Sequence, residues 1–160
     1  MNSNIKFLYI FLFLFSISCK TKAPFAYSLQ KSAIASQNMV VTAHPLASKI
    51  GLEILKKGGN AVDASIAIQY ALAVVYPVAG NIGGGGFMVL RLADGTTNTL
   101  DFREKAPGKA SRDMYLDDQK EVIPRLSIDG HLAAGVPGSV AGMEAAFQKY
   151  SSLKDFKALI

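Results

Sequence analysis

Apolar residues recur at helical spacing in three stretches of the chain. Leu46, Ile50 and Ile54 follow one another at four-residue steps, which predicts a helix with these side chains on one face. Residues 61–75 contain few polar side chains, so they predict a helix that is apolar nearly all round and buried in a core. Residues 143–150 carry apolar side chains at spacings of three, four and seven, which predicts a further helix.

The stretch before this last helix has the pattern of a β-hairpin. Residues 87–92 and 96–102 are two strand-like runs, and Asp94-Gly95 between them is a strong turn signal. Val40 and Val41 indicate a short buried strand or the end of one. Helices that flank an antiparallel hairpin predict the α+β class.

The first two predicted helices carry clear end signals. Pro45 suits a first helical turn, and the glycine pair at 58–59 ends that helix. Asn60 is suited to cap the next helix, with Asp63 as its acidic capping-box partner three residues on. We therefore assign Asp63 to capping and buried hydrogen bonding rather than to catalysis.

The N-terminal residues predict export. Residues 7–17 are almost continuously apolar, a run too short for the roughly 20 residues of a membrane-spanning helix but suited to a signal peptide at 1–18. Small residues precede Cys19, an arrangement similar to a bacterial lipobox, so we expect lipidation of Cys19 and a tether over 19–37. The alternative is an ordinary cleaved signal with an incidental cysteine. The expected location is the periplasm or cell envelope, with the protein anchored in the membrane through the lipid.

Composition excludes some classes of function. The formal net charge is +5, but the lysines are scattered and no basic stretch carries interleaved aromatic residues, which argues against nucleic-acid binding. The single cysteine leaves no partner for an internal disulfide. Leu153, Phe156 and Ile160 repeat at helical spacing up to the last residue, and we expect residues 38–160 to be the N-terminal part of a longer domain.

Most candidate chemical groups have ordinary structural explanations. The four glycines at 83–86 lack the Gly-Lys-Ser/Thr of a phosphate loop, so they predict close backbone packing at the start of a strand. Ser139 fits a helix start better than a nucleophile elbow. His44 and His131 lack metal-ligand spacing and fit packing or hydrogen-bonding roles. Asp117 and its neighbour Asp118 fit a solvated acidic turn, with cation binding as the alternative.

Arg103 is the strongest candidate for binding a ligand. It lies where the second strand is expected to end, and the planar guanidinium can grip a carboxylate with two parallel hydrogen bonds. The alternative is a structural ion pair with Glu104 or Asp101. The residues alone leave both roles open.

Three motifs in order carry a resemblance to a known family. Residues 57–64 read Lys-Gly-Gly-Asn-Ala-Val-Asp-Ala, residues 83–87 read Gly-Gly-Gly-Gly-Phe, and residues 101–107 read Asp-Phe-Arg-Glu-Lys-Ala-Pro. From about Asn38 onward the chain resembles the start of the large subunit of a γ-glutamyltransferase, an N-terminal-nucleophile hydrolase. The resemblance implies an αββα sandwich, of which these residues form the N-terminal portion.

The resemblance also implies an activity. In this family a precursor cleaves itself, and the threonine that begins the small subunit attacks glutathione or another γ-glutamyl compound. The γ-glutamyl group then passes to water, an amino acid or a peptide, and no metal or organic cofactor is implied. Arg103 corresponds to the arginine that grips the α-carboxylate. The nucleophile is expected beyond Ile160, so residues 1–160 alone should be inactive.

Two alternatives remain open at this point. One is a non-catalytic, lipid-anchored binding protein or remnant. The other is a related acylase or capsule-anchoring transpeptidase of the same family.

Overall fold

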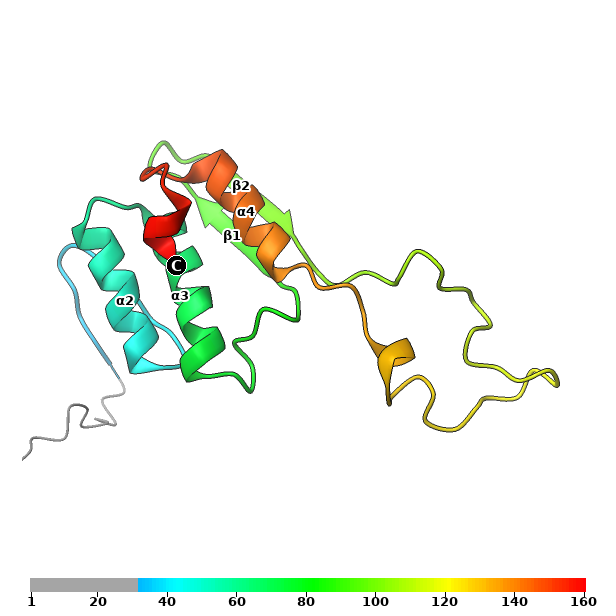
Figure 1. The fold of residues 1–160 in the computed structure, drawn as a ribbon. Helices are drawn as coiled ribbons and strands as arrows, with labels where there is room; N and C mark the ends of the chain where they lie inside the picture. The colour runs from blue at the N-terminus through cyan, green and yellow to red at the C-terminus, as the bar shows by residue number, and fades with distance from the viewer. Residues whose placement is uncertain (1–31) are drawn as a thin grey trace, which may run out of the picture. The chain divides into compact units, whose positions relative to one another are not determined.

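The computed structural model describes residues 32–160. The predicted signal peptide at 1–18, Cys19 and most of the tether at 19–37 lie outside the described residues. Residues Ala35–Ile160 form one compact unit, drawn in Figure 1. No helix in the described part is both long enough and apolar enough to cross a bilayer.

Helix and strand positions agree with the main sequence pattern. The elements in chain order are α2 (Pro45–Lys56), α3 (Ala61–Val75), β1 (Phe87–Arg91), β2 (Thr97–Asp101), η1 (His131–Ala133), α4 (Ser139–Tyr150) and η2 (Phe156–Leu159). The strand predicted at Val40 and Val41 is wrong: these residues form no strand, and Val41 is 82% exposed.

The buried face of α2 coincides only in part with the face that carries Leu46, Ile50 and Ile54. Its buried residues are Ala47, Gly51 and Ile54, whereas Leu46 is half-buried and Ile50 is 36% exposed. The reason is the close approach of α3. A Cβ atom on Gly51 would lie 2.5 Å from Cδ1 of Ile68, so the smallest side chains of α2 face its neighbour.

Helix α3 begins as predicted and is only partly buried. The Asn60 side chain accepts hydrogen bonds from the amides of Val62 and Asp63, and the Asp63 carboxylate accepts one from the Asn60 amide, which completes a capping box. The first half of α3 is buried, but Val74 near its end is 79% exposed. The prediction that α3 is buried along its whole length is therefore wrong: within residues 32–160, no other element covers its C-terminal end.

The predicted hairpin is confirmed. Strands β1 and β2 pair antiparallel with Met88 opposite Leu100, and both side chains pack against the core formed largely by α3 and α4. The amide of Thr96 donates to Asp94 Oδ1 at 2.8 Å in the turn, and this bond lowers the pKa of Asp94. The other face of β1 carries Phe87 and Val89, which are exposed. Helices on one face of an antiparallel hairpin confirm the α+β class.

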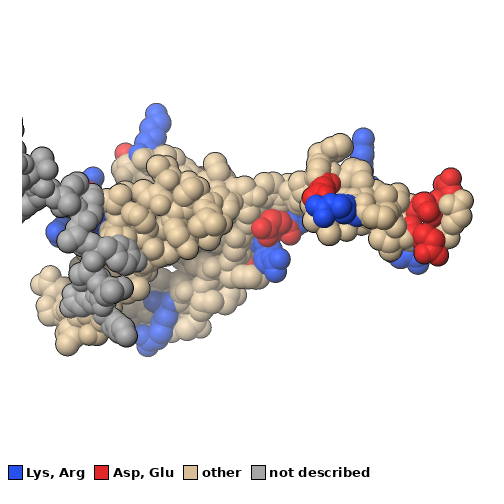
Figure 2. Space-filling view, turned by 90° about the horizontal axis from the view of Figure 1, so that it is seen from below, with Lys and Arg blue, Asp and Glu red and all other residues tan. Residues whose placement is uncertain are grey.

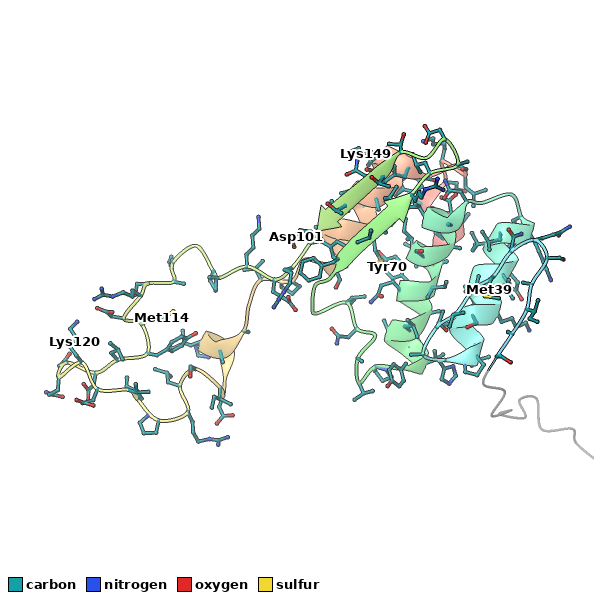
Figure 3. The ribbon with its side chains drawn as sticks, turned by 180° about the vertical axis from the view of Figure 1, so that it is seen from behind. Met39, Tyr70, Asp101, Met114, Lys120 and Lys149 are labelled. Atoms are coloured by element: carbon teal, nitrogen blue, oxygen red, sulfur yellow. The ribbon has the colours of Figure 1, made fainter. Side chains whose placement is uncertain are left out.

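The long segment between β2 and α4 is largely irregular and extends away from the packed helices before the chain returns to form α4 (Figure 1). Asp101, labelled in Figure 3, marks the end of β2, and Met114 and Lys120 lie in the segment that follows. An isolated bridge between Lys105 and Val136 holds the two ends of this segment together. Figure 2 shows acidic and basic side chains intermixed along it.

The C-terminal residues form a short 3-10 helix rather than the predicted helical stripe. Leu159 is the buried residue, and Ile160 is 71% exposed. Phe156 packs edge-on against Phe147 at a ring-centroid distance of 5.0 Å and against Tyr70 at 6.2 Å. These aromatic contacts join η2 to both α3 and α4.

Candidate functional site

The end of β2 is fixed by close packing around Phe102. A Cβ atom on Gly85 would lie 2.6 Å from the Phe102 carbonyl oxygen, and one on Gly86 would lie 2.9 Å from the Phe102 ring. Both distances are too short for any side chain. The predicted close backbone packing is confirmed at these two glycines, whereas a Cβ atom on Gly83 would have no neighbour nearer than 3.6 Å.

Helix α4 encloses Phe102 from another side. A Cβ atom on Gly142 would lie 2.2 Å from Phe102 Cγ, so only glycine fits there without a shift of the ring or the helix. The carbonyl oxygen of Gly84 accepts hydrogen bonds from the amides of Gly138 and Ser139, at 2.8 and 3.0 Å. The glycine run therefore caps the start of α4, whose own N-cap residue has no side chain to do so.

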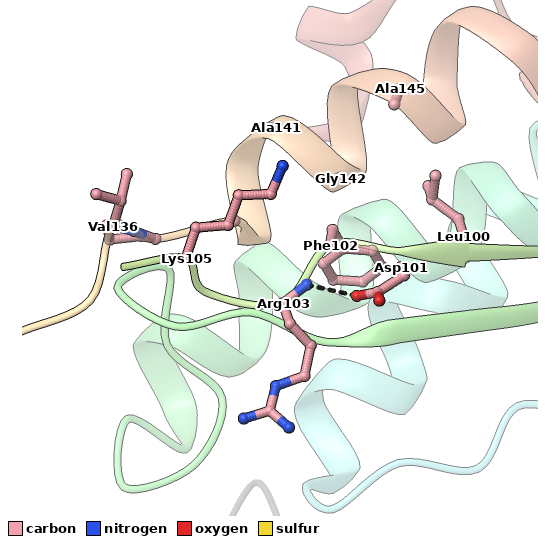
Figure 4. A pocket seen from close by; sticks show the side chains of 11 residues that line it. Leu100, Asp101, Phe102, Arg103, Lys105, Val136, Ala141, Gly142 and Ala145 are labelled. Carbon is pink, nitrogen blue, oxygen red and sulfur yellow. Dashed lines mark hydrogen bonds between the residues drawn. The ribbon is translucent and has the colours of Figure 1, made fainter. Parts of the chain in front are cut away.

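Arg103 follows this fixed point and projects outward. Its backbone amide donates to Asp101 Oδ1 at 3.0 Å, drawn as the dashed line in Figure 4. Its Nε atom lies 3.5 Å from Glu104 Oε2, and its Cζ atom lies 5.9 Å from the centroid of the Phe87 ring. Both acidic neighbours considered from the sequence thus contact Arg103, Asp101 through the backbone and Glu104 through the side chain.

The Arg103 guanidinium keeps hydrogen-bonding capacity. The side chain is 65% exposed, and within residues 32–160 the guanidinium donates no hydrogen bond. A guanidinium has five N–H donors in a rigid fork, and a carboxylate accepts two of them in parallel. The ion pair with Glu104 therefore leaves room for a bound carboxylate.

A hollow of about 290 Å³ lies between the end of β2 and the start of α4. Its lining is largely apolar and includes Leu100, Phe102, Ala141 and Ala145, with Lys105 at its edge. Figure 4 shows the Lys105 side chain directed toward α4 and the Arg103 side chain directed away from it. Arg103 is thus one of the residues that line the hollow, while its guanidinium lies beside the exposed Phe87 ring.

The other sequence candidates have structural roles or stand apart from this site. The Nδ1 atom of His44 accepts a hydrogen bond from the Leu46 amide at 3.3 Å, which makes His44 the cap of α2. Ser139 is buried at the start of α4, as predicted. Asp117 Oδ1 accepts hydrogen bonds from two amides of its own turn. His131 is exposed in η1. Within residues 32–160, no three His, Cys, Asp or Glu side chains come together as metal ligands would.

Phe87 is the site residue that sequence reasoning missed. It pairs with Asp101 across the hairpin, and its exposed ring lies beside Arg103. The predicted hairpin contained the information needed to find Phe87. Alternation along the strands places Phe87, Asp101 and Arg103 on one face once the register is known.

Comparison with known proteins gives consistent matches. The family model for gamma-glutamyltranspeptidase matches residues 47–160. The glutathione hydrolase proenzyme of Pseudomonas sp. (strain A14) is 61% identical over 118 residues, which are 74% of this chain and 20% of that protein. The corresponding proenzyme of Escherichia coli (strain K12) is 48% identical over 134 residues, 81% of this chain and 23% of that protein.

The structural match agrees with these relatives. The crystal structure of Helicobacter pylori gamma-glutamyltranspeptidase matches with a TM-score of 0.71 at 58% identity, over 76% of this chain and 35% of that one. This neighbour confirms the expected α+β fold of the N-terminal-nucleophile hydrolase type. The chain spans about a fifth to a quarter of the length of these two curated relatives. By its sequence and by its fold, the chain belongs to the gamma-glutamyltranspeptidase family.

Proposed function

We propose that the protein carrying these residues is a γ-glutamyltransferase that also hydrolyses glutathione. The observation that supports this most directly is the Arg103 side chain, held at the end of β2 with its guanidinium exposed. A γ-glutamyl group ends in an α-carboxylate, which such a fork binds with two charged hydrogen bonds. The glutathione hydrolase names of the relatives support the same substrate class.

The bond-making groups belong to the small subunit in this proposal. A threonine hydroxyl, with its own α-amine as base, attacks the γ-amide carbon and forms an ester, and the released amine takes up a proton. Water, an amino acid or a peptide then attacks the ester and carries the γ-glutamyl group away. Arg103 takes no part in these steps: it fixes the far end of the substrate, so that the γ-carbonyl meets the nucleophile in a constant position.

We also propose that the protein is exported and anchored through a lipid on Cys19. The support is the short apolar run at 7–17 and the small residues before the cysteine. The proposed partners are accordingly glutathione and other γ-glutamyl compounds, acceptor amino acids or peptides, the small subunit and the membrane surface.

Three anilides test the proposed function on the full-length, two-subunit protein. The γ-glutamyl anilide carries both the α-carboxylate and the α-amine. The 4-aminobutyryl anilide lacks the carboxylate, and the glutaryl anilide lacks the amine. We expect efficient turnover of the first and a loss of at least about tenfold in kcat/KM for the second, because the charged contact is missing.

The other outcomes identify the alternatives. Preference for the glutaryl anilide would make the protein an acylase of the same family. Absence of turnover with all three anilides would favour a non-catalytic binding protein.

A further inference from the structure

Phe87, which lies near Arg103, is an exposed aromatic residue that does not pack against the core. Phe87 is 64% exposed, and the side chains of its hairpin that pack against the core, Met88 and Leu100, lie on the opposite face. Within residues 32–160 the contact that sets Phe87 apart from the other exposed apolar residue of β1, Val89, is the one with Arg103. The Arg103 Cζ atom lies 5.9 Å from the Phe87 ring centroid.

We propose that Phe87 is a positioning residue, which holds the Arg103 guanidinium in the orientation that receives a substrate carboxylate. This inference rests on the proposed function. The negative face of an aromatic ring attracts a guanidinium within about 6 Å, and the attraction is about 0.5–1 kcal/mol at exposed sites.

Glu104 and Phe87 contact different atoms of the Arg103 guanidinium. Glu104 attracts the Nε atom at 3.5 Å, while the Phe87 ring lies near the central carbon. An exposed arginine otherwise samples many rotamers, and a bound substrate must then order them at an entropic cost. Phe87 reduces this cost by restricting the side chain before the substrate arrives.

Hairpin geometry makes the arrangement rigid. Phe87 is the first residue of β1 and pairs with Asp101, whose carboxylate also accepts the Arg103 backbone amide at 3.0 Å. Beyond this pair, Gly86 and Phe102 continue the pairing: the Phe102 amide donates to the Gly86 carbonyl oxygen at 3.0 Å, and the Gly86 amide donates to the Phe102 carbonyl oxygen at 3.4 Å. The ring and the arginine are thus carried by two paired strand ends rather than by a free loop.

The proposal predicts a specific pattern of kinetics. Uniform binding of substrate and transition state changes KM and leaves kcat unaltered. Phe87→Leu should therefore raise KM for the γ-glutamyl anilide by about two- to fivefold, the factor equivalent to about 0.5–1 kcal/mol. Phe87→Tyr keeps the ring face and should behave as wild type. Val89→Ala, which removes apolar surface from the same face of β1 two residues away, is the matched control and should leave KM unchanged.

A double-mutant cycle in the full-length protein decides the question. In an Arg103→Gln background no cation remains, so Phe87→Leu should cause no further loss in kcat/KM. The 4-aminobutyryl anilide, which has no α-carboxylate, should be indifferent to Phe87→Leu in either background.

Several results would overturn the proposal. These are an unchanged KM in Phe87→Leu, an equal loss with and without Arg103, or the same loss in Val89→Ala. If neither Phe87→Leu nor Phe87→Met accumulates as folded protein, Phe87 is a packing residue and the proposal is also wrong. A wild-type protein that treats the γ-glutamyl and 4-aminobutyryl anilides alike would remove the proposed function itself, and the inference with it.

Discussion

The carboxylate of Asp63 accepts a hydrogen bond from the backbone amide of Ser152 at 3.1 Å, although the two residues lie 89 positions apart. The same oxygen accepts the amide of Asn60 at 2.9 Å, and the Asn60 side chain donates to the Tyr150 carbonyl oxygen at 2.7 Å. Asp63 is fully buried. One capping box therefore serves two purposes: it starts α3 and holds the end of α4 against it.

Asp63→Ala should lower the stability of the full-length protein. The change removes the acceptor of the part-buried backbone amides of Asn60 and Ser152, and a lost hydrogen bond of this kind costs about 0.5–1.5 kcal/mol. The melting temperature, read by circular dichroism, measures the effect. Asp118→Ala is the matched control, because this exposed carboxylate should contribute within about 0.5 kcal/mol. Equal effects of the two substitutions would contradict the role of Asp63.

Gly142→Ala should also destabilise the protein, against the usual preference for alanine in helices. Alanine is normally better than glycine inside a helix by roughly 0.5–1 kcal/mol. Here the added Cβ atom would lie 2.2 Å from Phe102 Cγ, and such overpacking typically costs about 1–3 kcal/mol. Gly108→Ala is the control, since nothing lies within 4 Å of a Cβ atom there. A more stable Gly142→Ala protein would show that α4 moves freely relative to Phe102.

The same substitution connects stability with the site. Phe102 directly precedes Arg103, so a displaced ring should move the guanidinium and raise KM for γ-glutamyl substrates. The melting temperature and KM should thus change together in Gly142→Ala, while both remain unchanged in Gly108→Ala.

Local signals in the sequence were sufficient to predict helices α2, α3 and α4, the hairpin and several contacts. Asp94-Gly95 between two strand-like runs predicted the hairpin, and Asn60 with Asp63 predicted the start of α3, because these signals act over a few residues. The buried face of α2 was not predictable in the same way. It depends on how closely α3 approaches Gly51, which is a property of the packed pair. Likewise, the position of Arg103 followed from the end of a strand, but its contact with Phe87 required the strand register.

Residues 32–160 should be poorly stable as an isolated polypeptide and should not turn over γ-glutamyl anilides. Large apolar side chains at Val74, Val78 and Val89 are 79–81% exposed, and the hairpin leaves both strand edges unpaired within the described residues. Binding of a hydrophobic dye and thermal unfolding measure this directly. A soluble monomer with a cooperative transition, or turnover above a heat-treated control, would contradict the expectation.

Cys19→Ala should abolish lipid attachment. We expect the wild-type protein, expressed with its own N-terminus, to incorporate a fatty-acid probe and to sediment with membranes. The variant should carry no label and appear in the soluble fraction. A wild-type protein that is unlabelled and already soluble would mean that residues 1–18 are an ordinary cleaved signal and that the cysteine is incidental.

The most direct test of the account is KM for the γ-glutamyl anilide in Arg103→Lys of the full-length protein. Lysine keeps the charge but loses the planar fork that makes two parallel hydrogen bonds, and a hydrogen bond to a charged group typically contributes about 1.5–3 kcal/mol. We expect KM to rise by at least about tenfold, with kcat for the 4-aminobutyryl anilide little changed and with self-cleavage into two subunits intact. An unchanged KM, or a variant that fails to fold or to cleave itself, would show instead that Arg103 is a structural partner of Glu104.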